Sequence, residues 1–437
     1  MSIGRRSTAG DRIAFGYFLL ARVALATAGG LLLFAPPLDA GFYQPRVLAL
    51  THLLTLGWIT STILGVFYGP APRFFGGRSA NNVVDYVALG LFAPALAVFV
   101  ASFLLSQPAW RPFSAAVVAA AGAWAVSRYL WALRRSRWDR ASRWAIALGC
   151  WGWFLVSASG ALLADNSPWL GSDPLLRAAG HAHLGALSFA ATLVVGFGSR
   201  LLPMLLPSAN PPASFVLAAS SLLWTGGVAI AIAFWWGHGL VVAAVPALAG
   251  VLALFAQLVW MVRRPRTPSA LRSQREPGRW LLAMAFVSLG LAALVAMADL
   301  SGAFGDVASL RLAGVYVALL LVGFLGQLVA GLNGFIVPMW AWLCIQGGEV
   351  PDPAVPTPWR LEPRGVRRIA AVAWPLAVAA LALHLGGIHQ PFALAARFAG
   401  TCLLVVAACE LFSFLSLWRS DRHDGGHAPA AAGSLGS

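Results

Sequence analysis

The feature that most constrains this chain is a succession of twelve apolar runs, most of them 20 or more residues long. A helix of about 20 apolar residues crosses roughly 30 Å of hydrocarbon. Within lipid, only helices and closed barrels satisfy all their backbone hydrogen bonds. The sequence therefore predicts an all-α polytopic membrane protein with about 12 transmembrane helices. The expected spans are 13–35, 45–68, 84–106, 113–133, 144–164, 179–205, 214–236, 239–262, 280–300, 311–343, 369–387 and 392–418.

Composition supports this fold class. The chain is 59% hydrophobic and 10% charged, whereas a soluble domain is about a quarter charged. It therefore has too little polar surface to cover itself in water. The tenth apolar run exceeds one crossing, and we expect it to continue along the membrane interface.

The charged residues predict the orientation. The net charge is +15 and all thirty cations are arginines. In a soluble protein this charge would suggest nucleic acid. Here most arginines fall in alternate loops, so the positive-inside rule places both termini in the cytoplasm. We expect a multi-pass protein of a bacterial-type inner (plasma) membrane, with no nucleic-acid partner. Residues 1–420 form one transmembrane domain, and the polar segment 421–437 is expected to be a disordered cytoplasmic tail.

An internal repeat underlies the spans. Segments that start at His52, His183 and Ala318 lie 131 and 135 residues apart, in spans two, six and ten. They share a small residue five positions on, a glycine thirteen positions on and a proline twenty positions on. These residues are Gly57, Ser188 and Gly323; Gly65, Gly196 and Gly331; Pro72, Pro203 and Pro338. Small residues let helices approach closely in lipid. The pattern predicts three pseudo-symmetric four-helix units, 13–133, 144–262 and 280–418.

Histidines mark the candidate site. His52 and His183 hold the first repeat position at similar depth, where the third repeat has Ala318. A strongly polar group in lipid is costly and is a functional hypothesis by default. The two imidazoles could face one another and ligate one low-spin haem iron. Alternatively, both are packing residues held by hydrogen bonds.

His181 precedes His183 by two residues, so their side chains project about 200° apart on a helix. One helix can thus serve two neighbouring sites, or one site and a structural hydrogen bond. The four cysteines form no CxxC motif, which gives no support for covalent haem attachment or a thiolate metal site.

The segment GHAHLGALSFAATLVVGFGSRLLP, residues 180–203, resembles the HxH helix of haem–copper oxidase subunit I, particularly its cbb-type and nitric-oxide-reductase branch. THLLTLGWITSTILGVFY, from Thr51, resembles the other histidine-bearing helix of that family. The resemblance implies twelve helices in three arcs, with His183 facing His52 on a low-spin haem b. It implies that His181 corresponds to the high-spin haem ligand, with copper as a second metal.

The chain departs from that family in two ways. Its HxH motif lies on span six instead of span ten, and no His-His pair for a copper site occurs. The sequence therefore predicts no complete catalytic centre and no independent terminal oxidase. The HAH helix is also similar to that of the NnrS family, twelve-span proteins linked to haem, copper and nitric oxide stress. Leu184 stands where that family has an acidic residue.

Several other polar residues fall in or near the spans. Arg22 and Arg397 could pair with haem propionates or form ordinary interhelical bonds. We expect Arg200 to snorkel to the cytoplasmic face, and Asp85 and His384 to be interfacial. Glu410 is the one carboxylate that the sequence places deep in a span, where it could relay protons.

Together these features predict a haem–copper-oxidase-like membrane protein with one low-spin b-type haem. Such a protein could transfer electrons, sense redox state, or respond to nitric oxide or oxygen. Its expected partners are the lipid bilayer and a quinone or a cytochrome-type redox subunit. A membrane transporter of a metal ion or small solute is the alternative, and a scaffold that has lost its cofactor is a third hypothesis.

Overall fold

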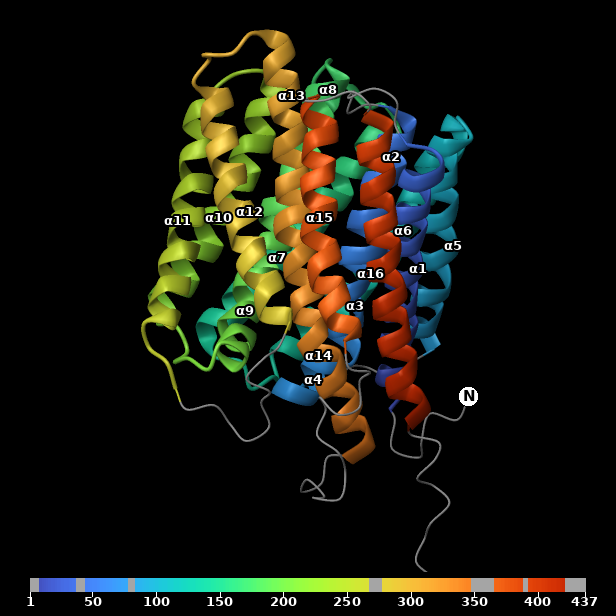
Figure 1. The fold of residues 1–437 in the computed structure, drawn as a ribbon, viewed down its shortest axis with the longest axis vertical. Helices are drawn as coiled ribbons and strands as arrows, with labels where there is room; N and C mark the ends of the chain where they lie inside the picture. The colour runs from blue at the N-terminus through green and yellow to red at the C-terminus, as the bar shows by residue number, and fades with distance from the viewer. Residues whose placement is uncertain are drawn as a thin grey trace, which may run out of the picture.

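The computed structural model describes residues 8–36, 44–77, 83–266, 277–346, 365–387 and 392–420. Within these residues the regular elements are helices, and twelve helical rods are long and apolar enough to cross a membrane. Each predicted span coincides with one rod, so the all-α polytopic membrane fold is confirmed. The rods run side by side along the long axis of the molecule (Figure 1). The predicted disordered tail, 421–437, lies outside the described residues.

The rods fall into three sets of four. The first set is α1 (Ala9–Phe34), a second rod made of α2 (Pro45–His52), η1 (Leu53–Thr60), α3 (Ser61–Tyr68) and α4 (Pro70–Phe75), then α5 (Val83–Leu104) and α6 (Arg111–Leu133). The second set is α7 (Arg140–Ala164), a sixth rod made of α8 (Pro174–His183), η4 (Leu184–Ala191) and α9 (Thr192–Leu205), then α10 (Ala213–Trp236) and α11 (Leu240–Val262). The third set is α12 (Pro277–Leu300), a tenth rod made of α13 (Asp306–Val317), η5 (Ala318–Gly326) and α14 (Gln327–Gln346), then α15 (Val366–Gly386) and α16 (Phe392–Ser420).

We call the face where α1 begins and α16 ends the N face, and the opposite one the distal face (Figure 1). The tenth rod is helical throughout from Asp306 to Gln346. The prediction that its end continues along the membrane interface stays a prediction.

A π-helical segment lies at the same repeat position in the second, sixth and tenth rods. It comes directly after His52 and His183, and it begins at Ala318 in the third repeat. π-helices are rare and mostly single turns, yet each segment here spans eight or nine residues. The repeat found in the sequence therefore also shows in the backbone.

A side chain donates to the same carbonyl in each π segment. The Ser61 hydroxyl donates to the Leu56 carbonyl at 3.1 Å, and the Thr192 hydroxyl donates to the Leu187 carbonyl at 2.8 Å. In the third repeat the indole N–H of Trp374 reaches the carbonyl of Val322 at 2.9 Å. All three carbonyls lie four positions after the repeat start. Because lipid offers no donors to a loosened backbone, these side chains stabilise the π winding.

Small residues join the second rod of each set to the first. A Cβ on Gly57 would lie 2.5 Å from the Cβ of Ala24, and one on Gly323 would lie 2.7 Å from the Cβ of Ser288. In the second set the glycine is Gly152, which belongs to the first rod, α7, and faces Ser188 of the sixth rod. A Cβ on Gly152 would lie 2.2 Å from the Ser188 carbonyl oxygen. The predicted close approach of these helices is confirmed.

Ion pairs fasten the same two rods at the N face. Arg73 pairs with Asp11 at 2.5 Å and Arg200 pairs with Asp139 at 2.9 Å, 62 and 61 residues apart in the chain. Burial raises the pKa of Asp139, but hydrogen bonds from Ser142 and Arg200 outweigh it and hold that pKa below its ordinary value. Because the folded pKa is lowered, this pair stabilises the fold at neutral pH and loses that effect as acid protonates the carboxyl.

Asp85 is the third residue of α5, at the helix end where the sequence predicts an interfacial residue. It is fully buried, and it accepts hydrogen bonds from the Tyr68 hydroxyl at 3.0 Å and from the Trp124 indole at 2.9 Å. Arg128 lies 3.9 Å from the same carboxylate. This polar network links the second, third and fourth rods, so its burial is explained by pairing within the bundle.

We predict that Gly152→Ala destabilises the protein by about 1–3 kcal/mol, because the added methyl group overpacks the contact with Ser188. Gly90→Ala is the matched control, since a Cβ there has nothing within 4 Å. Thermal unfolding of the detergent-solubilised variants measures the difference. Equal melting midpoints for the two variants would contradict the packing described here.

Candidate functional site

His52 ends α2, directly before the first π segment. Its Nδ1 lies 2.7 Å from the Leu48 carbonyl oxygen. Its ring packs edge-on against Phe99 and stacks on Phe103, with centroid distances of 4.9 and 5.4 Å. A carbonyl only accepts, so Nδ1 carries the proton. Nε2 therefore presents a lone pair.

His183 repeats this arrangement in the sixth rod. Its Nδ1 lies 2.8 Å from the Ala179 carbonyl oxygen, again four residues back. Its ring contacts Phe234 of α10 at a centroid distance of 5.3 Å. The aromatic partner lies on the third rod of the histidine's own set in both cases. The two residues are thus equivalent in local geometry as well as in repeat position.

His181 is fixed by a hydroxyl on α7. Its Nδ1 lies 2.9 Å from Ser159 Oγ, which in turn lies 3.0 Å from the Val156 carbonyl oxygen. The hydroxyl has one proton and donates it to Val156, so the imidazole Nδ1–H donates to Ser159. The ring lies over Gly160, where a Cβ would be 3.0 Å from its Cε1. His181 therefore also presents its Nε2 lone pair.

The three histidines share one tautomer, with Nδ1–H bonded to the protein and Nε2 able to accept a proton or ligate a metal. A hydrogen bond to the far ring nitrogen is the usual support for a metal-ligating imidazole. The sequence identifies the residue types but not the tautomer, because Leu48, Ala179 and Ser159 carry no recognisable signal.

The structure pairs these residues across the units in an offset register. His52 lies close enough to His181 for their charges to interact. The Nε2 of His183 lies 3.2 Å from the Tyr316 hydroxyl, and the two rings stack at a centroid distance of 5.7 Å. Tyr316 precedes Ala318 by two residues, as His181 precedes His183. The residue at the start of one repeat is therefore near the residue that comes two positions before the start of the next repeat. His52 is paired in this way with His181, and His183 with Tyr316.

The expected ligand pair, His52 and His183, stays a prediction. The contacts found for His183 lead to Tyr316, Phe234 and Ala179, whereas His52 shares its surroundings with His181. The two imidazoles have different hydrogen-bond partners, Ser159 for His181 and Tyr316 for His183. That this helix serves two neighbouring sites, or one site and a structural hydrogen bond, stays a prediction.

The other predicted site residues belong to other parts of the bundle. Arg22 is buried in α1 and donates to the carbonyls of Phe18 and Glu410, at 2.8 and 3.3 Å. It therefore forms an interhelical bond between α1 and α16. Arg397 is exposed on α16. His384, expected at the interface, is buried near the end of α15.

The donor atoms suit a haem better than a lone metal ion. Among the described residues, no group of three or more His, Cys, Asp or Glu side chains could hold a metal ion. His52 and His181 supply two imidazole nitrogens, which is the number a bis-histidine haem requires. Phe99 and Phe103 pack directly against His52, so a haem held by His52 would lie against aromatic side chains.

Comparisons with known proteins provide no relative. A scan against models of protein families finds no match, and neither does a search of curated protein sequences.

We predict that Tyr316→Phe destabilises the protein by about 1–3 kcal/mol, because the Nε2 of His183 loses its hydrogen-bond donor inside the bundle. Tyr86→Phe is the control. Tyr86 is partly exposed and its hydroxyl makes only a 3.5 Å contact, so its effect should stay within about 0.5 kcal/mol. Thermal unfolding of both variants provides the measurement, and a stable Tyr316→Phe protein would mean that this bond contributes nothing.

Proposed function

We propose that this protein binds one b-type haem with His52 and His181 as axial ligands, and that it serves in electron transfer or in a redox, nitric oxide or oxygen response. Two observations support this pair: a Coulomb interaction links the two rings, and the hydrogen bonds at Nδ1 leave the Nε2 of each ring with its lone pair. His183 is the weaker ligand candidate because its Nε2 accepts a hydrogen bond from Tyr316.

The residues around the pair support this role. The Leu48 carbonyl and the Ser159 hydroxyl hold each imidazole in the tautomer that ligates iron. Phe99 and Phe103 form an apolar wall on one side of His52, and a low local dielectric strengthens the influence of nearby dipoles on a bound group. A bound haem would supply a one-electron couple, tuned by its axial ligands and by burial.

The resemblance of residues 180–203 to the HxH helix of haem–copper oxidases, and to the NnrS family, supports the same cofactor class. In this proposal the N face is cytoplasmic, the membrane is a bacterial-type inner membrane, and electrons are exchanged with a quinone or a redox subunit. No copper centre and no independent oxygen reduction belong to the proposal, since the sequence lacks the His-His pair of that family.

Absorption spectra of the purified protein test the proposal. From haem-replete cells we expect a sharp reduced α-band in the wild type, and its loss in His52→Ala and in His181→Ala. His183→Ala and His384→Ala should retain the band, because neither residue is a proposed ligand. Added imidazole should restore the band in the two defective variants, which separates loss of a ligand from loss of the fold.

Two outcomes would contradict this assignment. Loss of the band in His183→Ala, with retention in His181→Ala, would return the ligand pair to His52 and His183. A folded, colourless wild-type protein would refute haem binding, and metal analysis of that protein would then test the transporter alternative.

A further inference from the structure

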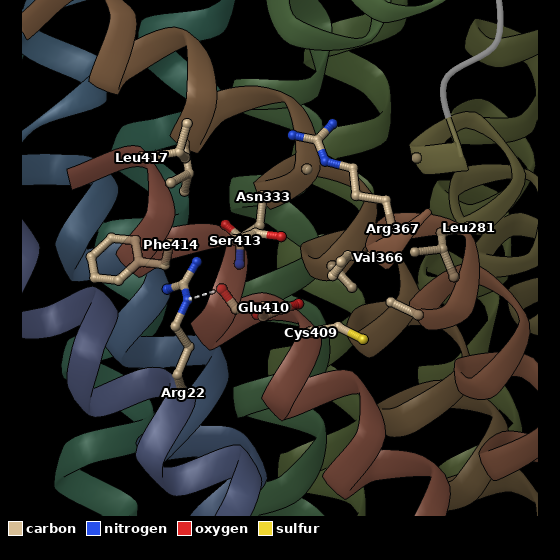
Figure 2. A pocket seen from close by; sticks show the side chains of 15 residues that line it. Arg22, Leu281, Asn333, Val366, Arg367, Cys409, Glu410, Ser413, Phe414 and Leu417 are labelled. Carbon is tan, nitrogen blue, oxygen red and sulfur yellow. Dashed lines mark hydrogen bonds between the residues drawn. The ribbon is translucent and has the colours of Figure 1, made fainter. Parts of the chain in front are cut away.

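A cavity with several polar side chains in a mostly apolar lining lies between the third unit and α1. It has a volume of about 50 Å³ and is bounded by α1, α12, α14, α15 and α16. Figure 2 shows the charged and polar side chains that project around it. They are Arg22, Asn333, Arg367, Cys409, Glu410 and Ser413. Such a concentration of polar groups inside an apolar bundle requires an explanation.

The cavity extends from the N face toward the middle of the membrane. Its outer end is lined by residues at helix ends, namely Gly278 of α12, Val366 of α15 and Leu417 of α16. Its inner end is lined by Arg22 and Glu410. At 1.5 Å per residue, Arg22 lies roughly 20 Å along α1, and Glu410 lies roughly 15 Å from the end of α16. Half of the hydrocarbon layer is about 15 Å, so the inner end is close to mid-membrane.

Arg22 is held firmly at this depth. Its guanidinium donates to the carbonyls of Phe18 and Glu410 and lies 4.3 Å from the centre of the Phe414 ring. The residue is only 4% exposed. Figure 2 shows the bond from Arg22 to the Glu410 backbone. A fixed positive charge is therefore built into the wall of the cavity, beside the helix turn that carries the Glu410 carboxyl.

The other groups around Glu410 can be named from every helix that lines the cavity. Besides Arg22, α15 contributes the cation Arg367 and α16 contributes the thiol of Cys409. The lining residues of α14 include the neutral Asn333, and those of α12 are Gly278 and Leu281. The described lining thus holds two cations and one carboxyl. Protonation of that carboxyl changes the net charge of the lining from +1 to +2.

The size of the cavity limits what can occupy it. A buried water occupies about 10–15 Å³ of cavity volume. The cavity volume of about 50 Å³ therefore holds roughly three or four waters. A haem is too large for this space. Water that reaches from the N face to a carboxyl provides a route for protons.

We propose that this cavity is a water-filled inlet from the N face and that the Glu410 carboxyl at its inner end takes up and releases protons. In this step a proton from the N-face solvent passes along the cavity waters as hydronium and binds a carboxylate oxygen of Glu410, which leaves neutral water; release is the reverse. The inference does not depend on haem binding, because none of its residues belongs to the histidine pair.

Two native cysteines on α16 test the water inlet. Cys409 lines the cavity, whereas Cys402 lines an open apolar groove of about 520 Å³ formed by α15 and α16. A water-soluble, membrane-impermeant methanethiosulfonate applied at the N face should modify Cys409 and leave Cys402 and the fully buried Cys150 unmodified. A lipid-soluble maleimide should reach Cys402. Failure of the water-soluble reagent to modify Cys409 would overturn the inlet.

The proton site is tested with dicyclohexylcarbodiimide, which reacts with protonated carboxyls in apolar surroundings. Peptide mass spectrometry should find the adduct on Glu410, with its rate falling about tenfold per pH unit once the carboxyl is mostly ionised. Glu410→Gln should abolish this adduct. Asp85→Asn is the matched control, because Asp85 is a buried carboxyl outside the cavity and its loss should leave the Glu410 adduct unchanged.

Cys409 labelling in Glu410→Gln shows whether that variant keeps its cavity. An accessible Cys409 together with a Glu410 that never reacts, at any pH, would overturn proton uptake. The haem spectrum is read on the same samples, so failure of this inference and failure of haem binding are distinguishable.

Discussion

Every backbone carbonyl inside the bilayer needs a hydrogen-bond donor, and this requirement governs the three central rods. Their π segments loosen the helix for two turns at a depth where water cannot compensate. Ser61, Thr192 and Trp374 supply donors to the equivalent carbonyls. The histidines His52 and His183 stand immediately before these segments. The winding after each histidine is thus held by a specific side chain.

The repeated scaffold carries different chemistry at each junction between units. The first junction brings together two histidines, and the second joins His183 to Tyr316. Between the third unit and α1, the polar groups are Arg22 and Glu410, placed toward the N face. Backbone and small-residue packing recur while the polar side chains change. The three units therefore differ mainly in the polar side chains at a few equivalent positions.

Much of the frame was predictable from the sequence. Apolar run length identified the twelve spans, and the matched offsets of Gly65, Gly196 and Gly331 identified the repeat, because both depend on local sequence and on the small volume that close helix packing demands. The same logic could not orient the histidines. A π segment adds residues to a turn and rotates the helix before it relative to the helix after it, and nothing in the sequence marks that winding plainly.

Position along a span was also a poor guide to exposure. Asp85 and His384 lie near helix ends, which suggested interfacial roles, yet both are buried. For Asp85 the cause is visible, since Tyr68, Trp124 and Arg128 converge on its carboxylate from neighbouring rods. The burial of Asp85 thus depends on partners that are distant in the sequence. The site residues that reasoning from spacing alone missed, Ser159 and Tyr316, are of this kind.

The offset register has a consequence for how such a scaffold can be redesigned. Because the first position of one repeat lies beside the residue two places before the start of the next, the third junction has its own pair of positions, held by Ala318 and Leu50. These are the sites at which two histidines would copy the first junction. A threefold arrangement of this kind offers three equivalent pairs of positions, at which polar side chains can be exchanged while the helices keep their places.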